Sequence, residues 1–213
     1  MNTINIMQLF GSNLSDYKFK KFKKNRVNDV FFKRMKEDKY EYKEHYVFID
    51  SRNRDRTKFP SPNNYTVQFN NGDDGNIREQ FKNIVSIQLV DAIIPDAVAS
   101  LVPYLTLDIP ELRPSYAGTN SHLSNTFGIL LPETTGTPFA RCKFVSPVLN
   151  KYRTPRASLN KLSLKFKNSD GSLYMFGTDT PPPIQPDITL QNQLIFKIIT
   201  RTSDYKVLEP ILT

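Results

Sequence analysis

Few residues of this chain have the type and spacing that catalysis or metal binding requires. The chain has two histidines, His45 and His122, and one cysteine, Cys142. Zinc sites draw on several His and Cys ligands at short spacing, and the sequence contains no such group. Cys142 stands between Arg141 and Lys143, which point to the opposite face of a strand, so it has no base beside it. We therefore predict no catalytic residues, no metal and no cofactor.

Carboxylates are the other candidates for chemistry. Five aspartates lie at or near the ends of predicted strands, namely Asp50, Asp55, Asp91, Asp96 and Asp108. Gathered at one rim of a sandwich, they could hold calcium or act as a pair of acids. We favour the alternative that they cap turns and pair with Arg52, Arg54 and Arg56.

A more distinctive motif directly follows the first predicted strand. In the segment 50–56, arginines occupy alternate positions, at Arg52, Arg54 and Arg56. If the chain stays extended, the three side chains project the same way. Because arginine pairs in bidentate fashion with carboxylates and phosphates, they are candidates for a subunit or nucleic-acid contact. The alternative is a local loop held by salt bridges.

The N-terminal segment 1–45 differs from the rest of the chain. Between Tyr17 and Lys36 it has nine basic residues and one acidic residue, Asp29, with aromatic residues interleaved. The basic residues are Lys18, Lys20, Lys21, Lys23, Lys24, Arg26, Lys33, Arg34 and Lys36. Such a segment repels itself and cannot build a core, so we predict an extended arm. Its partner could be neighbouring protein, an anionic membrane or nucleic acid, and a solvated tail is the remaining alternative.

The elements that must position these residues are short strands. Apolar and polar residues alternate at 65–69, 104–109 and 161–167, which is typical of strands with one buried face. Turn formers separate such runs, and no helical pattern of ten or more residues lies between them. The predicted strands are 46–50, 65–69, 84–93, 104–109, 127–131, 140–145, 161–167, 172–177 and 193–200. We predict an all-β, antiparallel β-sandwich of eight to nine strands.

Length and composition fit one such domain. The 213 residues accommodate a sandwich over 46–213 and the arm over 1–45. No stretch approaches the ~20 apolar residues of a membrane-spanning helix, and the N-terminus lacks the pattern of a signal peptide. The net charge of +8 favours acidic partners.

Several runs, in this order, resemble the small capsid proteins of nucleocytoplasmic large DNA viruses. The resemblance extends in patches from Tyr46 to Thr200. The runs are YVFIDSRNRD at 46–55, PNNYTVQF at 62–69, IVSIQLVDAIIP at 84–95, YLTLDIPEL at 104–112, LNKLSLKF at 159–166 and GSLY at 171–174.

The resemblance implies a single jelly roll in an icosahedral shell, acting as a minor capsid protein. Some members are pentons at the vertices and others cement capsomers, and the family carries no enzymatic residues. It implies contacts with the major capsid protein and other minor capsid proteins, self-association as a pentamer if the chain is a penton, location in the virion and assembly in the host cytoplasm. The long basic arm suits a cementing protein or a vertex protein that reaches the inner membrane. The alternative function is a nucleic-acid-binding module that uses the arm.

Overall fold

The computed structural model describes residues 40–95, 102–112, 116, 118–133 and 138–203. The chain divides into two compact units, one of residues 42–202 and one of residues 1–41 and 203–213. The fold lies in the first unit. Its described part contains nine β-strands and three short 3₁₀ turns, with no α-helix. The strands are β1 (Tyr40–Asp50), β2 (Asn64–Gln68), β3 (Lys82–Pro95), β4 (Leu105–Asp108), β5 (Thr126–Glu133), β6 (Phe139–Phe144), β7 (Val148–Ser158), β8 (Lys161–Lys167) and β9 (Gln193–Ser203).

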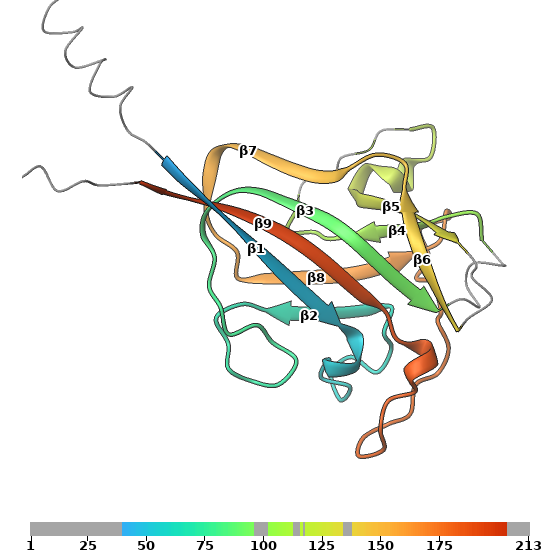
Figure 1. The fold of residues 1–213 in the computed structure, drawn as a ribbon. Helices are drawn as coiled ribbons and strands as arrows, with labels where there is room; N and C mark the ends of the chain where they lie inside the picture. The colour runs from blue at the N-terminus through green and yellow to red at the C-terminus, as the bar shows by residue number, and fades with distance from the viewer. Residues whose placement is uncertain (1–39, 96–101, 113–115, 117, 134–137, 204–213) are drawn as a thin grey trace, which may run out of the picture. The chain divides into compact units, whose positions relative to one another are not determined.

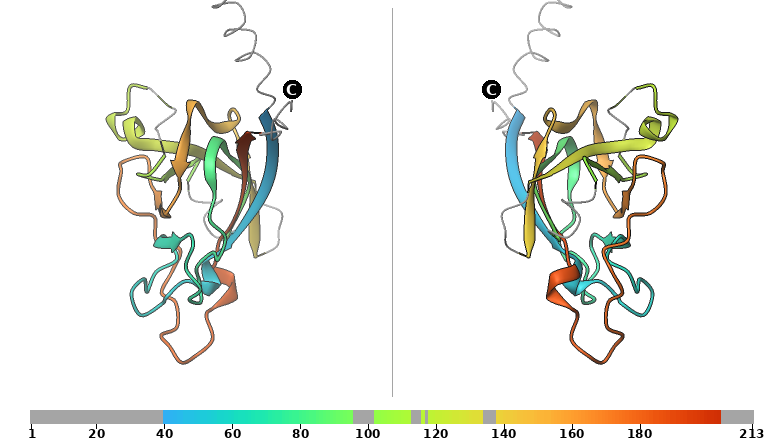
Figure 2. Two further views of the ribbon diagram at one scale, coloured as in Figure 1. Left: turned by 90° about the vertical axis from the view of Figure 1, so that its left-hand side faces the viewer. Right: turned by 90° about the vertical axis from the view of Figure 1, so that its right-hand side faces the viewer.

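The strands form two layers (Figures 1 and 2). The hydrogen-bonded order is β1-β9-β3-β6-β5-β4-β8-β2, and β7 also pairs with β3. The first layer therefore consists of β1, β9, β3 and β7, and the second of β5, β4, β8 and β2. Strand β6 connects them because it pairs with β3 at one end and with β5 at the other.

This topology is that of a jelly roll. The strand pairings described among β2 to β9 are antiparallel. Strands distant in sequence lie side by side, as β1 does with β9 and β2 with β8. Two four-stranded antiparallel layers with such crossovers define the jelly roll, so the predicted fold class is confirmed.

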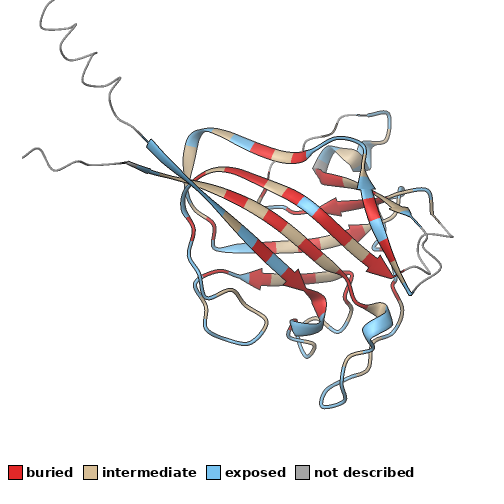
Figure 3. Cartoon of the chain, in the orientation of Figure 1, coloured by how far each residue is buried: buried red, intermediate tan, exposed pale blue. Residues whose placement is uncertain are grey.

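The core lies between the layers and follows from the alternation of the sequence. In the second layer Tyr65 stands opposite Leu164, and both are buried. In the first layer Leu89 stands opposite Phe196, and both are again buried (Figure 3). Each fully buried large apolar side chain contributes about 1.5–3 kcal/mol, so the inward rows hold the layers together.

One predicted strand, 172–177, does not form. The described chain there has a single bridge between Lys167 and Leu173, and the Tyr174 N–H donates to the Phe166 carbonyl at 2.9 Å. Tyr174 and Phe176 are nevertheless buried, and the Phe176 ring meets the Phe166 ring edge-on at 5.2 Å. The alternation therefore predicted the burial of these side chains correctly, but burial alone does not pair two strands through backbone hydrogen bonds.

Strand β7 was not predicted, because its sequence lacks a sustained alternation of apolar and polar residues. Its first half buries only Val148 and Asn150, while its second half contains charged residues and Pro155. It pairs with β3 alone, so it is an edge strand, where proline is tolerated. Strand β1 was predicted to begin at residue 46 but begins at Tyr40. Its first residues are exposed and show no alternating burial, so the search for alternation missed them.

Candidate interaction site

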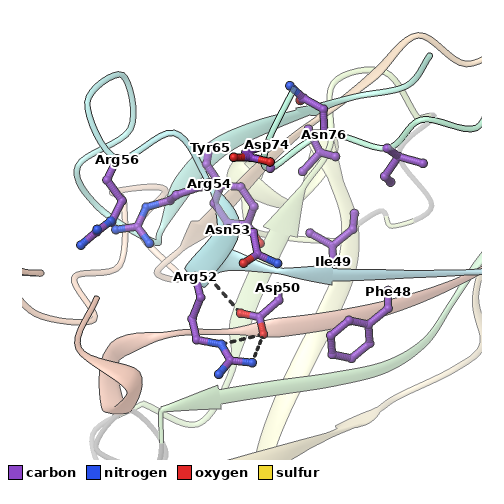
Figure 4. A pocket seen from close by; sticks show the side chains of 13 residues that line it. Phe48, Ile49, Asp50, Arg52, Asn53, Arg54, Arg56, Tyr65, Asp74 and Asn76 are labelled. Carbon is purple, nitrogen blue, oxygen red and sulfur yellow. Dashed lines mark hydrogen bonds and ion pairs between the residues drawn. The ribbon is translucent and has the colours of Figure 1, made fainter. Parts of the chain in front are cut away.

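The arginine motif lies on a tight turn at the end of β1. Asp50 caps the 3₁₀ turn η2 (Ser51–Asn53), and its Oδ1 accepts a hydrogen bond of 2.9 Å from the Arg52 N–H. The chain is therefore not extended over this motif, and the condition for three parallel arginine side chains is not met. Figure 4 shows Arg52 turned toward Asp50, away from Arg54 and Arg56.

Arg54 is directed into the protein. Its side chain is fully buried, and its guanidinium group donates five hydrogen bonds of 2.7–2.8 Å, which uses all five N–H groups. The acceptors are the carbonyls of Ser51, Phe59 and Pro60, Gln191 Oε1 and Asp179 Oδ2. Arg54 therefore fits the alternative of a local salt-bridged loop, and no donor is left for a neighbouring subunit.

The Asp179 carboxylate completes this buried cluster. Burial raises the pKa of Asp179, but hydrogen bonds from the Asp187 N–H, Arg54, Gln191 and the Thr180 N–H outweigh it, so the pKa lies below its ordinary value. The carboxylate is thus ionised beside Arg54, and the pair ties the loop before η4 (Ile188–Leu190) to the turn after β1.

Arg52 and Arg56 remain accessible. The Arg52 side chain is 42% exposed and pairs with Asp50, while Arg56 donates to the Thr180 carbonyl at 2.9 Å. Both line a cavity of about 530 Å³ whose other wall is the β2–β3 loop with Asp74 and Gly75. The subunit or nucleic-acid contact therefore stays a prediction for these two residues.

Gly75 brings that loop against the arginine turn. Its φ is +80°, and a Cβ atom there would lie 2.1 Å from the Asn53 carbonyl oxygen. Only glycine fits such a close approach with a positive φ, so this wall of the cavity depends on Gly75.

The aspartates do not gather at one rim. Asp50 pairs with Arg52 and Asp91 with Arg141. Asp55 pairs with Lys58 at 3.2 Å and Asp108 with Lys167 at 2.6 Å, while Asp96 lies outside the described residues. No group of three or more possible metal ligands occurs in the part of the chain that the structure describes. Of the expected pairs with Arg52, Arg54 and Arg56, only that of Asp50 with Arg52 occurs among these four aspartates, while Asp55 accepts from backbone N–H groups of its own turn and Asp91 and Asp108 pair with other cations.

The histidines and the cysteine occupy separate places. His45 Nε2 lies 3.0 Å from Thr200 Oγ1, and His122 is exposed on the turn η3 (Ser121–Asn125). Cys142 is buried in β6, where burial and the nearby Asp91 charge raise the pKa of its thiol to about 12. Such a thiol is a poor nucleophile.

The basic arm was the other predicted contact. Its nine basic residues, from Lys18 to Lys36, lie outside the described residues, so its role stays a prediction. In the described part of the chain, no helix has the length and apolar character needed to cross a membrane.

Comparison with known proteins shows a similarity to a capsid protein. Residues 35–101, which include β1, β2 and β3, match the model of a family of unknown function, DUF5901. Over 134 residues the chain is 28% identical to the penton capsid protein P1 of Paramecium bursaria Chlorella virus 1. The aligned region covers 61% of this chain and 74% of that protein. The resemblance to small jelly-roll capsid proteins of large DNA viruses is thereby confirmed.

Sequence reasoning missed the partners of Arg54. Asp179 and Gln191 lie more than a hundred residues along the chain, in a loop without any regular pattern. No local signal pairs such distant residues, because the pairing arises only when β9 lies beside β1.

Proposed function

We propose that this chain is a structural component of the icosahedral capsid of a large DNA virus, and that it forms the vertex as a penton. The similarity to a penton capsid protein carries this proposal, because it covers 74% of that protein's length. The jelly-roll fold agrees with it. The protein acts through contacts with other subunits and not through catalysis.

The architecture suits a building block of a shell. The core between the layers is complete within one chain, so the outer faces and loops are available for neighbours. Lattices repeat modest contacts by symmetry, and a rigid sandwich presents such contacts in a constant geometry.

The vertex is preferred to a cementing position because the relative is named as a penton. At the vertex the partners are the major capsid protein, other minor capsid proteins and further copies of this chain. The arm contacts neighbouring protein or the inner membrane, and the particle assembles in the host cytoplasm.

Imaging of intact particles tests the proposal directly. We expect density that fits the described jelly roll at the fivefold vertices, and peptides from this chain in purified particles. Density for the jelly roll only between capsomers would move it to a cementing position. Absence of the chain from purified particles would refute the capsid role.

The alternative function through the basic arm has its own test. Nucleic-acid binding predicts affinity that falls steeply with salt and is lost when residues 17–36 are deleted. This deletion spares β1, which begins at Tyr40. A flat salt response, or affinity unchanged by the deletion, would eliminate that alternative.

A further inference from the structure

The outer face of the first layer exposes several large apolar side chains among polar ones. Val47 and Ile49 of β1 point into the core, so Tyr46 and Phe48 between and beside them point outward. We name this surface the aromatic face and define it by Tyr42, Tyr46 and Phe48 of β1, Val90 of β3, and Ile195 and Ile199 of β9. Figure 3 shows the corresponding change between buried and exposed residues along β1.

The exposure of these side chains exceeds what a solvated sheet face requires. Tyr42 is 59% exposed, Tyr46 65%, Phe48 56% and Val90 42%. The outer face of the second layer differs, because paired positions there are polar, as Thr66 opposite Ser163 and Asn64 opposite Lys165. One face of the sandwich is therefore suited to water and the other to a partner.

Four charged groups on this side of the first layer are paired within the chain, while the exposed Lys151 of β7 lines a pocket with Tyr42 and Ile199. Lys197 forms an ion pair with Glu44, and its Nζ lies 6.0 Å from the centroid of the Tyr46 ring. Arg141 Nε donates to Asp91 Oδ1 at 3.0 Å. The phosphates of a nucleic acid or an anionic membrane would have to compete with Glu44 and Asp91 for Lys197 and Arg141. The basic arm would find both carboxylates already paired. The face therefore fits a neutral, apolar protein surface.

The area available matches the apolar part of a stable interface. A Phe or Tyr side chain buries about 150–250 Å², so three that are more than half exposed offer about 350 Å². Val90 and the partly exposed Ile195 and Ile199 bring the total toward about 450 Å². A standard interface buries about 800 Å² per partner, of which somewhat more than half is apolar. The aromatic face supplies about that share.

We propose that the aromatic face is covered by a second copy of this chain. The inference rests on the proposed function, since a penton places several copies of one chain in contact by symmetry. Tyr46 and Phe48 are the central contacts, because they are successive outward positions of β1 and both are more than half exposed, so they lose much water on association. Lys197 and Glu44 enter the interface as a neutralised pair.

Self-association of the purified full-length chain tests this proposal. We expect native mass spectrometry and light scattering to show an oligomer at high micromolar concentration. Tyr46→Glu with Phe48→Glu should raise the dissociation constant at least about tenfold, because each places an unpaired charge in the contact. Met175→Glu is the matched control, since Met175 is 64% exposed but belongs to the segment beside β8 of the second layer. It should leave the oligomer unchanged.

A second measurement separates loss of contact from loss of folding. Val90→Cys introduces an exposed thiol, and the native Cys142 is buried and gives little background. We expect maleimide to label this thiol several-fold more slowly in the oligomer than after dilution to monomer. A monomeric wild type, an oligomer insensitive to the Tyr46 and Phe48 changes, or equal labelling in both states would overturn the proposal.

These outcomes are distinct from those that test the capsid role. If the chain is present in particles but Tyr46→Glu with Phe48→Glu still self-associates, the capsid role stands and the interface lies elsewhere. If the chain is absent from particles while these substitutions abolish the oligomer, the interface stands and the capsid role fails.

Discussion

Replacing Arg54 by alanine is the sharpest test of how this fold is held together at the rim. The guanidinium group is fully buried and donates to five acceptors, one of which is the Asp179 carboxylate with 1% of its side chain exposed. Arg54→Ala leaves that buried carboxylate without its cation and removes the guanidinium donors from three backbone carbonyls, of which only that of Ser51 keeps a bond from the backbone N–H of residue 54.

The expected loss of stability follows from this burial. Removing one partner of a buried ion pair costs about 3–5 kcal/mol. For a domain of this size, 1 kcal/mol shifts the Tm by about 2–4 °C, so Arg54→Ala should lower it by roughly 6–20 °C. Arg52 offers a matched control two residues away. Its side chain is 42% exposed, and the buried Asp50 carboxylate keeps hydrogen bonds from the Arg52 N–H and from Gln193 Nε2, so Arg52→Ala should cost clearly less than Arg54→Ala.

Urea unfolding followed by far-ultraviolet circular dichroism measures both variants. The chain has no tryptophan, so backbone signal and tyrosine fluorescence are the suitable probes. Arg54→Lys keeps the charge but loses the planar fork, and we expect it to fall between wild type and Arg54→Ala. If Arg54→Ala is no more destabilising than Arg52→Ala, the buried cluster does not hold the rim and the reasoning is wrong.

Three further predictions concern other residues. Because the folded state lowers the pKa of Asp179, its contribution is present above the ordinary value and disappears as pH falls below about 4, so the wild-type advantage over Asp179→Asn should shrink there in acid unfolding curves. Gly75→Ala should destabilise by at least about 1–2 kcal/mol, whereas Gly72→Ala, with nothing within 4 Å of the added Cβ, should be nearly neutral in the same urea assay. Cys142 should resist thiol reagents at pH 8 when folded and react after unfolding, and rapid labelling of the native protein would contradict its burial.

Local alternation was enough to predict the fold class and most strands. Leu162, Leu164 and Phe166 alternate with polar residues, and β8 begins and ends with this pattern, at Lys161 and Lys167. Side chains of a strand point to opposite faces in turn, so a two-residue period carries both the strand and its buried face. The same period misled at 172–177, where Tyr174 and Phe176 bury their rings without a ladder.

Strand β7 shows the limit of that signal. Its residues are mostly exposed or half-buried, and it exists because the backbone of β3 offers an unpaired edge. That edge is a property of the assembled sheet, since β3 pairs with β9 along one side and with β7 along the other. The sequence of β7 alone, with Pro155 and its charges, indicates a loop.

The arginine motif shows most clearly the difference between what the sequence indicates and what the folded chain adds. From the sequence alone come three arginines at alternate positions after a strand, and with them the choice between an outward contact and a local loop held by salt bridges. The folded chain is needed to place Arg54 inside the protein, because two of its five acceptors, Asp179 and Gln191, come from a loop distant in sequence that β9 brings beside β1. The outward rows of β1 and β9 were likewise present in the sequence, but their union into one aromatic face requires the crossover that places the two strands side by side.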